Sequence, residues 1–114
     1  MKHLNTFIFL VFYFISQNVY ADGNELLKQC LAVEKENINE SFNIGMCLGL
    51  GQGVRNTMQL LPNNEFKACF PKNGISNGQA TRIIVSYLKK NPAKLHENEI
   101  ALIIMAYIDA YPCK

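Results

Sequence analysis

Apolar residues along most of this chain recur at intervals of three and four positions, which is the spacing of one face of an α-helix. Four segments show this pattern, and they cover residues 24–36, 40–61, 76–91 and 97–111. No stretch alternates apolar and polar residues in the way a half-buried strand does. We therefore predict an all-α fold, a small bundle of about four helices.

Boundary signals support this division. Ser76 is followed three residues later by Gln79, which is the pattern of a capping box at a helix start. Residues 62–75 are mostly polar and contain two prolines and a glycine, so this segment is predicted to be a loop. Residues 100–106 (IALIIMA) are apolar on every side, which is typical of a helix that is covered all round. Such a helix is either central in the bundle or covered partly by a second subunit.

The stretch CLGLGQGVRN, residues 47–56, has the glycine content of a phosphate-binding loop but not its pattern. A dinucleotide loop needs G-x-G-x-x-G after a strand, and a P-loop ends in Gly-Lys-Ser/Thr. Gly45, Gly49 and Gly53 instead recur every four residues, so they share one helix face that another helix could approach closely. We predict a helix here, which could be irregular near residues 51–53, and no nucleotide site.

The N-terminus has the pattern of a secretory signal peptide. Lys2 precedes an apolar run at residues 7–15, and the small-x-small motif at residues 19–21 follows. The run is well short of the ~20 residues that span a bilayer. We expect cleavage after Ala21, which leaves residues 22–114 as a single exported domain with no membrane attachment.

Four cysteines fall in that domain, and an exported chain with an even number of cysteines is expected to form disulfides. Zinc ligands usually come in close pairs, and these cysteines are far apart. A hairpin of the first two helices, turning near residues 37–39, would bring Cys30 level with Cys47. A hairpin of the last two would bring Cys69 near Cys113. Four cysteines allow three pairings, and this geometry favours Cys30–Cys47 with Cys69–Cys113.

Charge and reactive groups narrow the function classes. The formal net charge of the 114 residues is only +2, so no basic patch points to nucleic acid. His96 is the one histidine of residues 22–114, and its place at a turn is typical of a surface or capping residue. Paired cysteines are not available as nucleophiles. We therefore predict no catalytic residues, no metal, no cofactor and no enzyme activity.

The chain from Cys47 onward resembles the Tai/Rap-type immunity proteins of bacterial type VI secretion systems. The similar segments are CLGLGQG, then CFPKNGISNGQATRIIVSYLKKNPAKLH, then AYIDAYPC. The residues that match the family pattern are Cys47, Gly49, Gly53, Cys69, Pro71, Gly78, Gln79, Tyr87, Leu88, Pro92, Tyr111, Pro112 and Cys113. Leu50 stands where the family often has an aromatic residue.

The resemblance implies a function. Such proteins are small, exported and helical, and they neutralise cell-wall amidase toxins. By this resemblance the chain is a periplasmic immunity protein that binds a peptidoglycan amidase and occludes its cleft. The alternative is a periplasmic structural or chaperone-like helical protein without a toxin partner.

The loop at residues 62–75 is the expected contact surface for the toxin. Its prolines limit its conformations, and Cys69 can tether it. Phe66 and Phe70 are both candidate anchors for the partner. The alternative is that both rings are lids on the core, which fits Phe70 beside the cysteine somewhat better, so Phe66 is the better candidate for exposure. We predict that the partner-binding residues are Phe66, Lys67, Lys72 and Asn73.

The apolar side chains on all sides of the last helix also predict an assembly state. If Ile100, Ile103, Ile104 and Tyr107 face the bundle, then Leu102, Met105 and the glycine face of the second helix remain to be covered. So short a chain has few elements to cover both. We therefore predict a homodimer.

Overall fold

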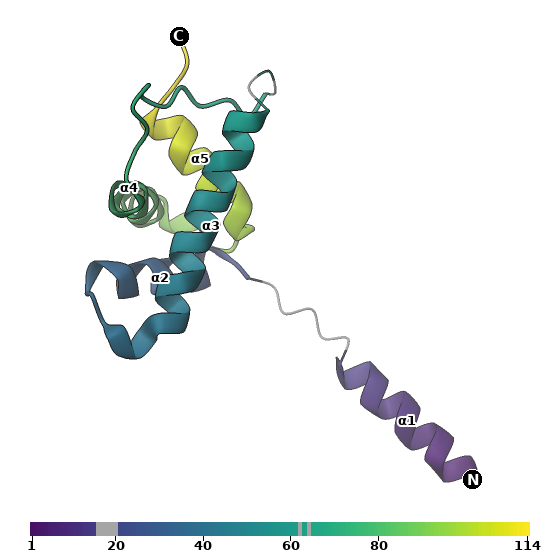
Figure 1. The fold of residues 1–114 in the computed structure, drawn as a ribbon. Coiled ribbons are helices and arrows are strands. Elements are labelled where there is room, and N and C mark those ends of the chain that lie inside the picture. The colour runs from purple at the N-terminus through teal and green to yellow at the C-terminus, as the bar shows by residue number, and fades with distance from the viewer. Residues whose placement is uncertain (16–20, 62, 64) are drawn as a thin grey trace.

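The structure is a computed structural model that describes residues 1–15, 21–61, 63 and 65–114 (Figure 1). These residues form five α-helices and no strand. The helices are α1 (Lys2–Ile15), α2 (Gly23–Glu34), α3 (Ser41–Leu60), α4 (Asn77–Lys90) and α5 (Glu99–Ala110). Two short 3-10 helices, η1 (Ile38–Glu40) and η2 (Pro92–Lys94), precede α3 and α5. The all-α prediction is confirmed.

The number of helices differs from the predicted four. Helices α2 to α5 are the four predicted segments, and α1 is the additional one. It lies inside the predicted signal peptide, which the sequence analysis treated as a targeting segment and not as part of the bundle. It makes no extended packing contact with the other helices (Figure 1). Residues 16–20, which include most of the expected cleavage motif, lie outside the described residues.

No helix in the described part of the chain is both long enough and apolar enough to cross a membrane.

Polar side chains fix where the helices begin. The Asp22 carboxylate accepts hydrogen bonds from the amides of Asn24 and Glu25 at the start of α2. These bonds, chiefly the one from Glu25, lower the pKa of the Asp22 carboxyl. Asn98 caps α5 in the same way, so that helix begins at Glu99 and not at residue 97 as predicted. Each such cap contributes about 1 kcal/mol.

The capping box at α4 is confirmed in one half only. The Ser76 hydroxyl accepts from the Gln79 amide at 3.1 Å, as predicted. The Gln79 side chain does not return to the Ser76 backbone. Its amide nitrogen donates to the Tyr111 hydroxyl at 3.1 Å, which joins the first turn of α4 to the end of α5.

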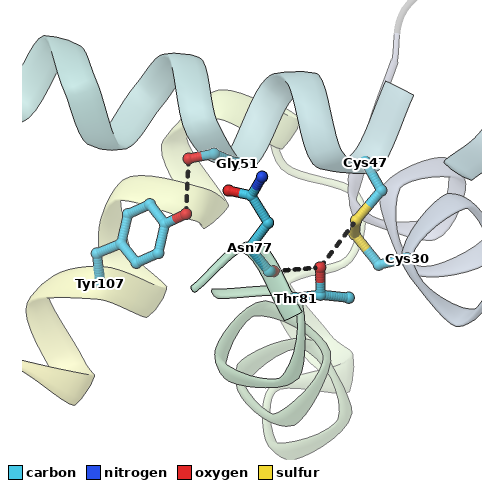
Figure 2. Close-up of a disulfide and its surroundings, with 6 residues drawn as sticks. All are labelled: Cys30, Cys47, Gly51, Asn77, Thr81 and Tyr107. Atoms are coloured by element: carbon cyan, nitrogen blue, oxygen red, sulfur yellow. Dashed lines mark hydrogen bonds between the residues drawn. A yellow bond between two sulfur atoms is a disulfide. The ribbon is translucent and has the colours of Figure 1, made fainter. Parts of the chain in front are cut away.

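Helix α3 runs without a break through its glycines, and the close approach falls on the glycine outside the predicted stripe. Gly45, Gly49 and Gly53 share an open face, and a Cβ at any of them would meet nothing within 4 Å. At Gly51, a Cβ would lie 3.3 Å from both Ile84 Cδ1 and the Tyr107 hydroxyl. That hydroxyl donates to the Gly51 carbonyl at 2.7 Å (Figure 2). The prediction that another helix of the same chain packs closely on the face of Gly45, Gly49 and Gly53 is therefore wrong.

The core lies among α2, α3, α4 and α5, and all four contribute fully buried side chains. The largest of these are Leu26, Cys30, Cys47, Ile84, Leu88, Leu102, Ile103 and Tyr107. Burying side chains of this size stabilises the fold by about 1.5–3 kcal/mol each. The prediction that Leu102 is left uncovered is wrong, because it packs against Gly23 of α2, where any Cβ would overlap it. Met105 is 40% exposed, as predicted.

The predicted disulfide pairing is confirmed. Cys30–Cys47 joins α2 to α3, and both residues are buried. Cys69–Cys113 joins the loop before α4 to the segment after α5. The Thr81 hydroxyl of α4 lies 4.0 Å from Cys47 Sγ and donates its one proton to the Asn77 carbonyl (Figure 2). The first bridge is therefore enclosed by three helices.

Two alanine substitutions in α3 test the placement of the glycines. Gly45→Ala should raise the free energy of unfolding by about 0.5–1 kcal/mol, because it removes backbone entropy from the unfolded state without meeting any neighbour. Gly51→Ala should leave the free energy of unfolding unchanged or lower it, because its Cβ crowds the hydrogen-bonded, fully buried Tyr107. Urea unfolding of both variants measures the difference, and equal stabilisation by the two would contradict this packing.

Candidate partner-binding surface

Residues 65–75 cross the end of the bundle between α3 and α4 (Figure 1). The segment is fixed near its middle, where the Cys69 amide donates to the Tyr111 carbonyl at 2.8 Å and the Cys69 side chain is bonded to Cys113. A turn follows, closed by a bond from the Gly74 amide to the Pro71 carbonyl at 2.9 Å. Gly74 has a φ of +73°, a conformation that glycine adopts without strain. The loop therefore has a fixed course despite having no helix of its own.

Phe70 anchors this loop to the core. Its ring lies 5.3 Å from the Tyr107 ring, edge to face, and 5.6 Å from the Tyr111 ring. Aromatic pairs of this kind contribute about 0.5–1.5 kcal/mol beyond the area that they bury. Of the two interpretations of Phe70, partner anchor or core lid, these contacts support the lid, so Phe70 belongs to the support of the loop and not to its outer face.

The four predicted partner-binding residues all lie at the surface. Phe66 is 50% exposed, and Lys67, Lys72 and Asn73 are exposed. Lys67 and Lys72 line the same shallow pocket of about 370 Å³ beside Cys69, together with Phe70 and the end of α3. Phe66 and Asn73 do not line that pocket. The structure thus brings the two lysines together around the disulfide and places Phe66 outside the pocket.

Beneath the loop lies a polar contact that the sequence analysis missed. Arg55 of α3 is only 9% exposed, and its Nη2 donates to the Asn77 side chain at 3.1 Å. Its Nη1 is buried and has no hydrogen-bond partner in the described part of the chain. The sequence does hold a signal for the burial of Arg55: it lies beside Val54 and three residues before Met58, both on the buried face of α3. Arg55 ties the first turn of α4 to α3.

Tyr107 joins the core to the loop. Burial raises the pKa of its hydroxyl to about 12, and the nearby positive charge of Arg55 opposes that rise only in part. The hydroxyl is therefore a hydrogen-bond donor at any ordinary pH. It acts as a fixed structural group between α3 and the ring of Phe70.

An apolar groove lies between α3 and α5. It has a volume of about 390 Å³, and its lining residues are Leu50, Gly53, Val54, Thr57, Met58, Ile100 and Ile104. Gly53 belongs to the open glycine face of α3, so the groove continues onto that face. Leu50, at which the sequence departs from the family pattern, is one of its walls.

His96 is exposed between η2 and α5. In the described residues, no group of three or more histidine, cysteine, aspartate or glutamate side chains could hold a metal ion.

These features define a class of protein: a small, doubly disulfide-bridged helical bundle that presents an anchored loop at one end. The model of the Rap1a immunity protein family matches residues 22–113, and the chain belongs to that family. The resemblance found in the sequence is thereby confirmed. Neither the curated proteins nor the solved structures contain a match to this chain.

The two phenylalanines of the loop make a matched pair of test positions. Phe70→Ala should lower the free energy of unfolding by about 2 kcal/mol, because it removes a half-buried ring held by two aromatic neighbours. Phe66→Ala should change it by less than about 0.5 kcal/mol, because half of that ring is already in water. Urea unfolding measures both, and the reverse order would place Phe66 in the support of the loop.

Proposed function

We propose that residues 22–114 form a periplasmic immunity protein that binds and occludes a peptidoglycan amidase toxin of a type VI secretion system. Membership of the Rap1a immunity family supports an immunity role against a secreted toxin. The observation that carries the mechanism is the loop at residues 65–75, fixed at Cys69 and exposed at Phe66, Lys67, Lys72 and Asn73. The protein acts by binding, with no chemistry of its own.

Occlusion follows from the way this loop is held. A segment that plugs a cleft must keep its shape without the partner, because each side chain or loop residue that is ordered on binding lowers affinity. The disulfide, the Cys69–Tyr111 hydrogen bond and the Phe70 ring contacts hold it in advance. Phe66 supplies an apolar anchor of the kind that dominates protein interfaces. Lys67 and Lys72 would speed association with an acidic rim.

Export is part of the proposal. The N-terminal pattern of charge, apolar run and small residues supports a signal peptide cleaved after Ala21, and the family match begins one residue later, at Asp22. Two disulfides are typical of an oxidising compartment such as the periplasm.

If an amidase reading frame adjoins this gene, its purified product is the probe for the binding test. The chain from residue 22 should bind it with a Kd near nanomolar, about −12 kcal/mol, and inhibit peptidoglycan cleavage. Phe66→Ala with Lys67→Ala should weaken binding at least 100-fold, because the pair removes the apolar anchor and a rim charge. Calorimetry measures the affinity, and circular dichroism establishes that the variant is folded.

The matched control changes Lys89→Ala and Lys90→Ala, which removes two exposed charges from the end of α4. Affinity close to that of the unaltered chain is expected. Unchanged affinity in the folded loop variant would exclude the loop as the contact and point to the turn at residues 91–98. An absence of any bound amidase would favour a structural or chaperone-like protein without a toxin partner.

We also propose that the chain forms a homodimer through the groove between α3 and α5. The groove is apolar, and the open face at Gly53 and Gly49 lets another helix come close. Three exposed side chains add to this apolar surface: Leu60 at the end of α3, Leu61 directly after it, and Met105 of α5. A second copy would remove this surface from water.

Light scattering tests the dimer. The chain from residue 22 should show twice the monomer mass at micromolar concentration. Gly53→Arg should reduce it to the monomer, because the new side chain fills the open face where the second helix packs. Ser86→Arg, on an exposed position of α4, should leave the dimer intact. A monomer of the unaltered chain at high micromolar concentration would refute the proposal.

A further inference from the structure

The two disulfides of this protein lie in opposite environments. Cys30 and Cys47 are at most 1% exposed, whereas Cys69 is exposed and Cys113 is half-buried. We propose that Cys69–Cys113 is a thiol–disulfide exchange site, opened by a dithiol reductant, and that its redox state determines whether residues 65–75 stay fixed on the bundle. The consequence for toxin binding rests on the proposed function, but the exchange itself does not.

The surroundings of Cys69 favour the reaction. Lys67 and Lys72 line an open pocket with it, so an incoming thiolate finds both access and positive charge. Nearby cations also lower the pKa of a cysteine thiol, so Cys69 leaves readily when it is later released from the mixed disulfide with the reductant. On the other side, Cys113 Sγ lies only 3.9 Å from the Lys67 carbonyl oxygen. The attack is therefore directed to Cys69.

The buried bridge lacks these features. Cys30 and Cys47 lie in the core among apolar side chains of α2, α3 and α4, and their nearest polar contact is the neutral Thr81 hydroxyl. An apolar environment raises the pKa of a thiol and disfavours the thiolate that exchange requires. A reductant could reach this bridge only after the helices separate.

The exchange takes two balanced steps. One thiolate of the dithiol attacks Cys69 Sγ, a mixed disulfide forms, and Cys113 leaves as a thiolate that takes up a proton. The second thiolate of the same reductant attacks its own sulfur in the mixed disulfide and releases Cys69, which is also protonated. The dithiol loses two electrons and becomes a disulfide, and the protein gains two thiols.

Reduction removes the one covalent anchor of the loop and leaves the bundle intact. The Phe70–Tyr107 contact to α5 remains, whereas the Cys69–Tyr111 hydrogen bond and the Phe70–Tyr111 contact depend on the segment after α5 that Cys113 held in place. Cys30–Cys47 still joins α2 to α3. The expected product is a folded bundle in which residues 65–75 and 111–114 open more readily, with the Phe70–Tyr107 contact left to hold the loop on α5.

The test exposes the oxidised chain from residue 22 to limiting dithiothreitol at neutral pH. Free thiols are blocked with N-ethylmaleimide at intervals and located by peptide mass mapping. Cys69 and Cys113 should be labelled at least tenfold faster than Cys30 and Cys47. Hydrogen–deuterium exchange on the singly reduced chain should rise at least tenfold in residues 65–75 and stay unchanged in α2 and α3.

A matched pair of variants separates local charge from net charge. Lys67→Gln with Lys72→Gln should slow the opening of Cys69–Cys113 at least threefold, whereas Lys89→Gln with Lys90→Gln should not change it. Both bridges opening together, or equal slowing in the two variants, would overturn the proposal. So would exchange in residues 65–75 that does not respond to reduction. These readouts need no toxin, so they stand or fall separately from the immunity function.

Discussion

The hydrogen bond from the Tyr107 hydroxyl to the Gly51 carbonyl is the contact on which the rest of this structure depends. It is 2.7 Å long and fully buried, and a Cβ at position 51 would crowd it, at 3.3 Å from the hydroxyl. It fixes how closely α5 packs on α3. The same ring also contacts Phe70, so the position of the loop follows in part from the position of this one tyrosine. A core contact thereby sets the geometry of the candidate binding surface.

The two disulfides stabilise different parts of the protein. Cys30–Cys47 lies inside the bundle, where it restricts the conformations of the unfolded chain and contributes almost nothing to the exposed surface. Cys69–Cys113 lies at the end of the bundle, where it holds a segment that has few other contacts. On the loop-entropy model such bridges stabilise a fold by about 3–4 kcal/mol each. Of the two, only Cys69–Cys113 stabilises a surface that a partner could reach.

Much of the fold could be predicted because it depends on local chemistry. Four helices follow from apolar spacing, and the start of α4 follows from Ser76, whose side chain accepts from the amide of Gln79. The disulfide pairing also followed from hairpin geometry along the chain. The candidate site was predictable in part: Phe66 was the better candidate for exposure, because a ring beside a bridged cysteine, as Phe70 is, is held near the core.

The sequence by itself therefore determined the four helices of the bundle, the cap at Ser76, the cysteine pairs and the family. Tertiary structure decided which of several equivalent residues make the long-range contacts. Gly51 and not the regular glycine stripe meets Tyr107, Gln79 bonds Tyr111 instead of its own helix start, and Leu102 is covered by Gly23. Arg55 likewise turned inward to Asn77. The reason is physical: periodicity defines a face, but the rotation of each helix about its axis is set by packing against its neighbours.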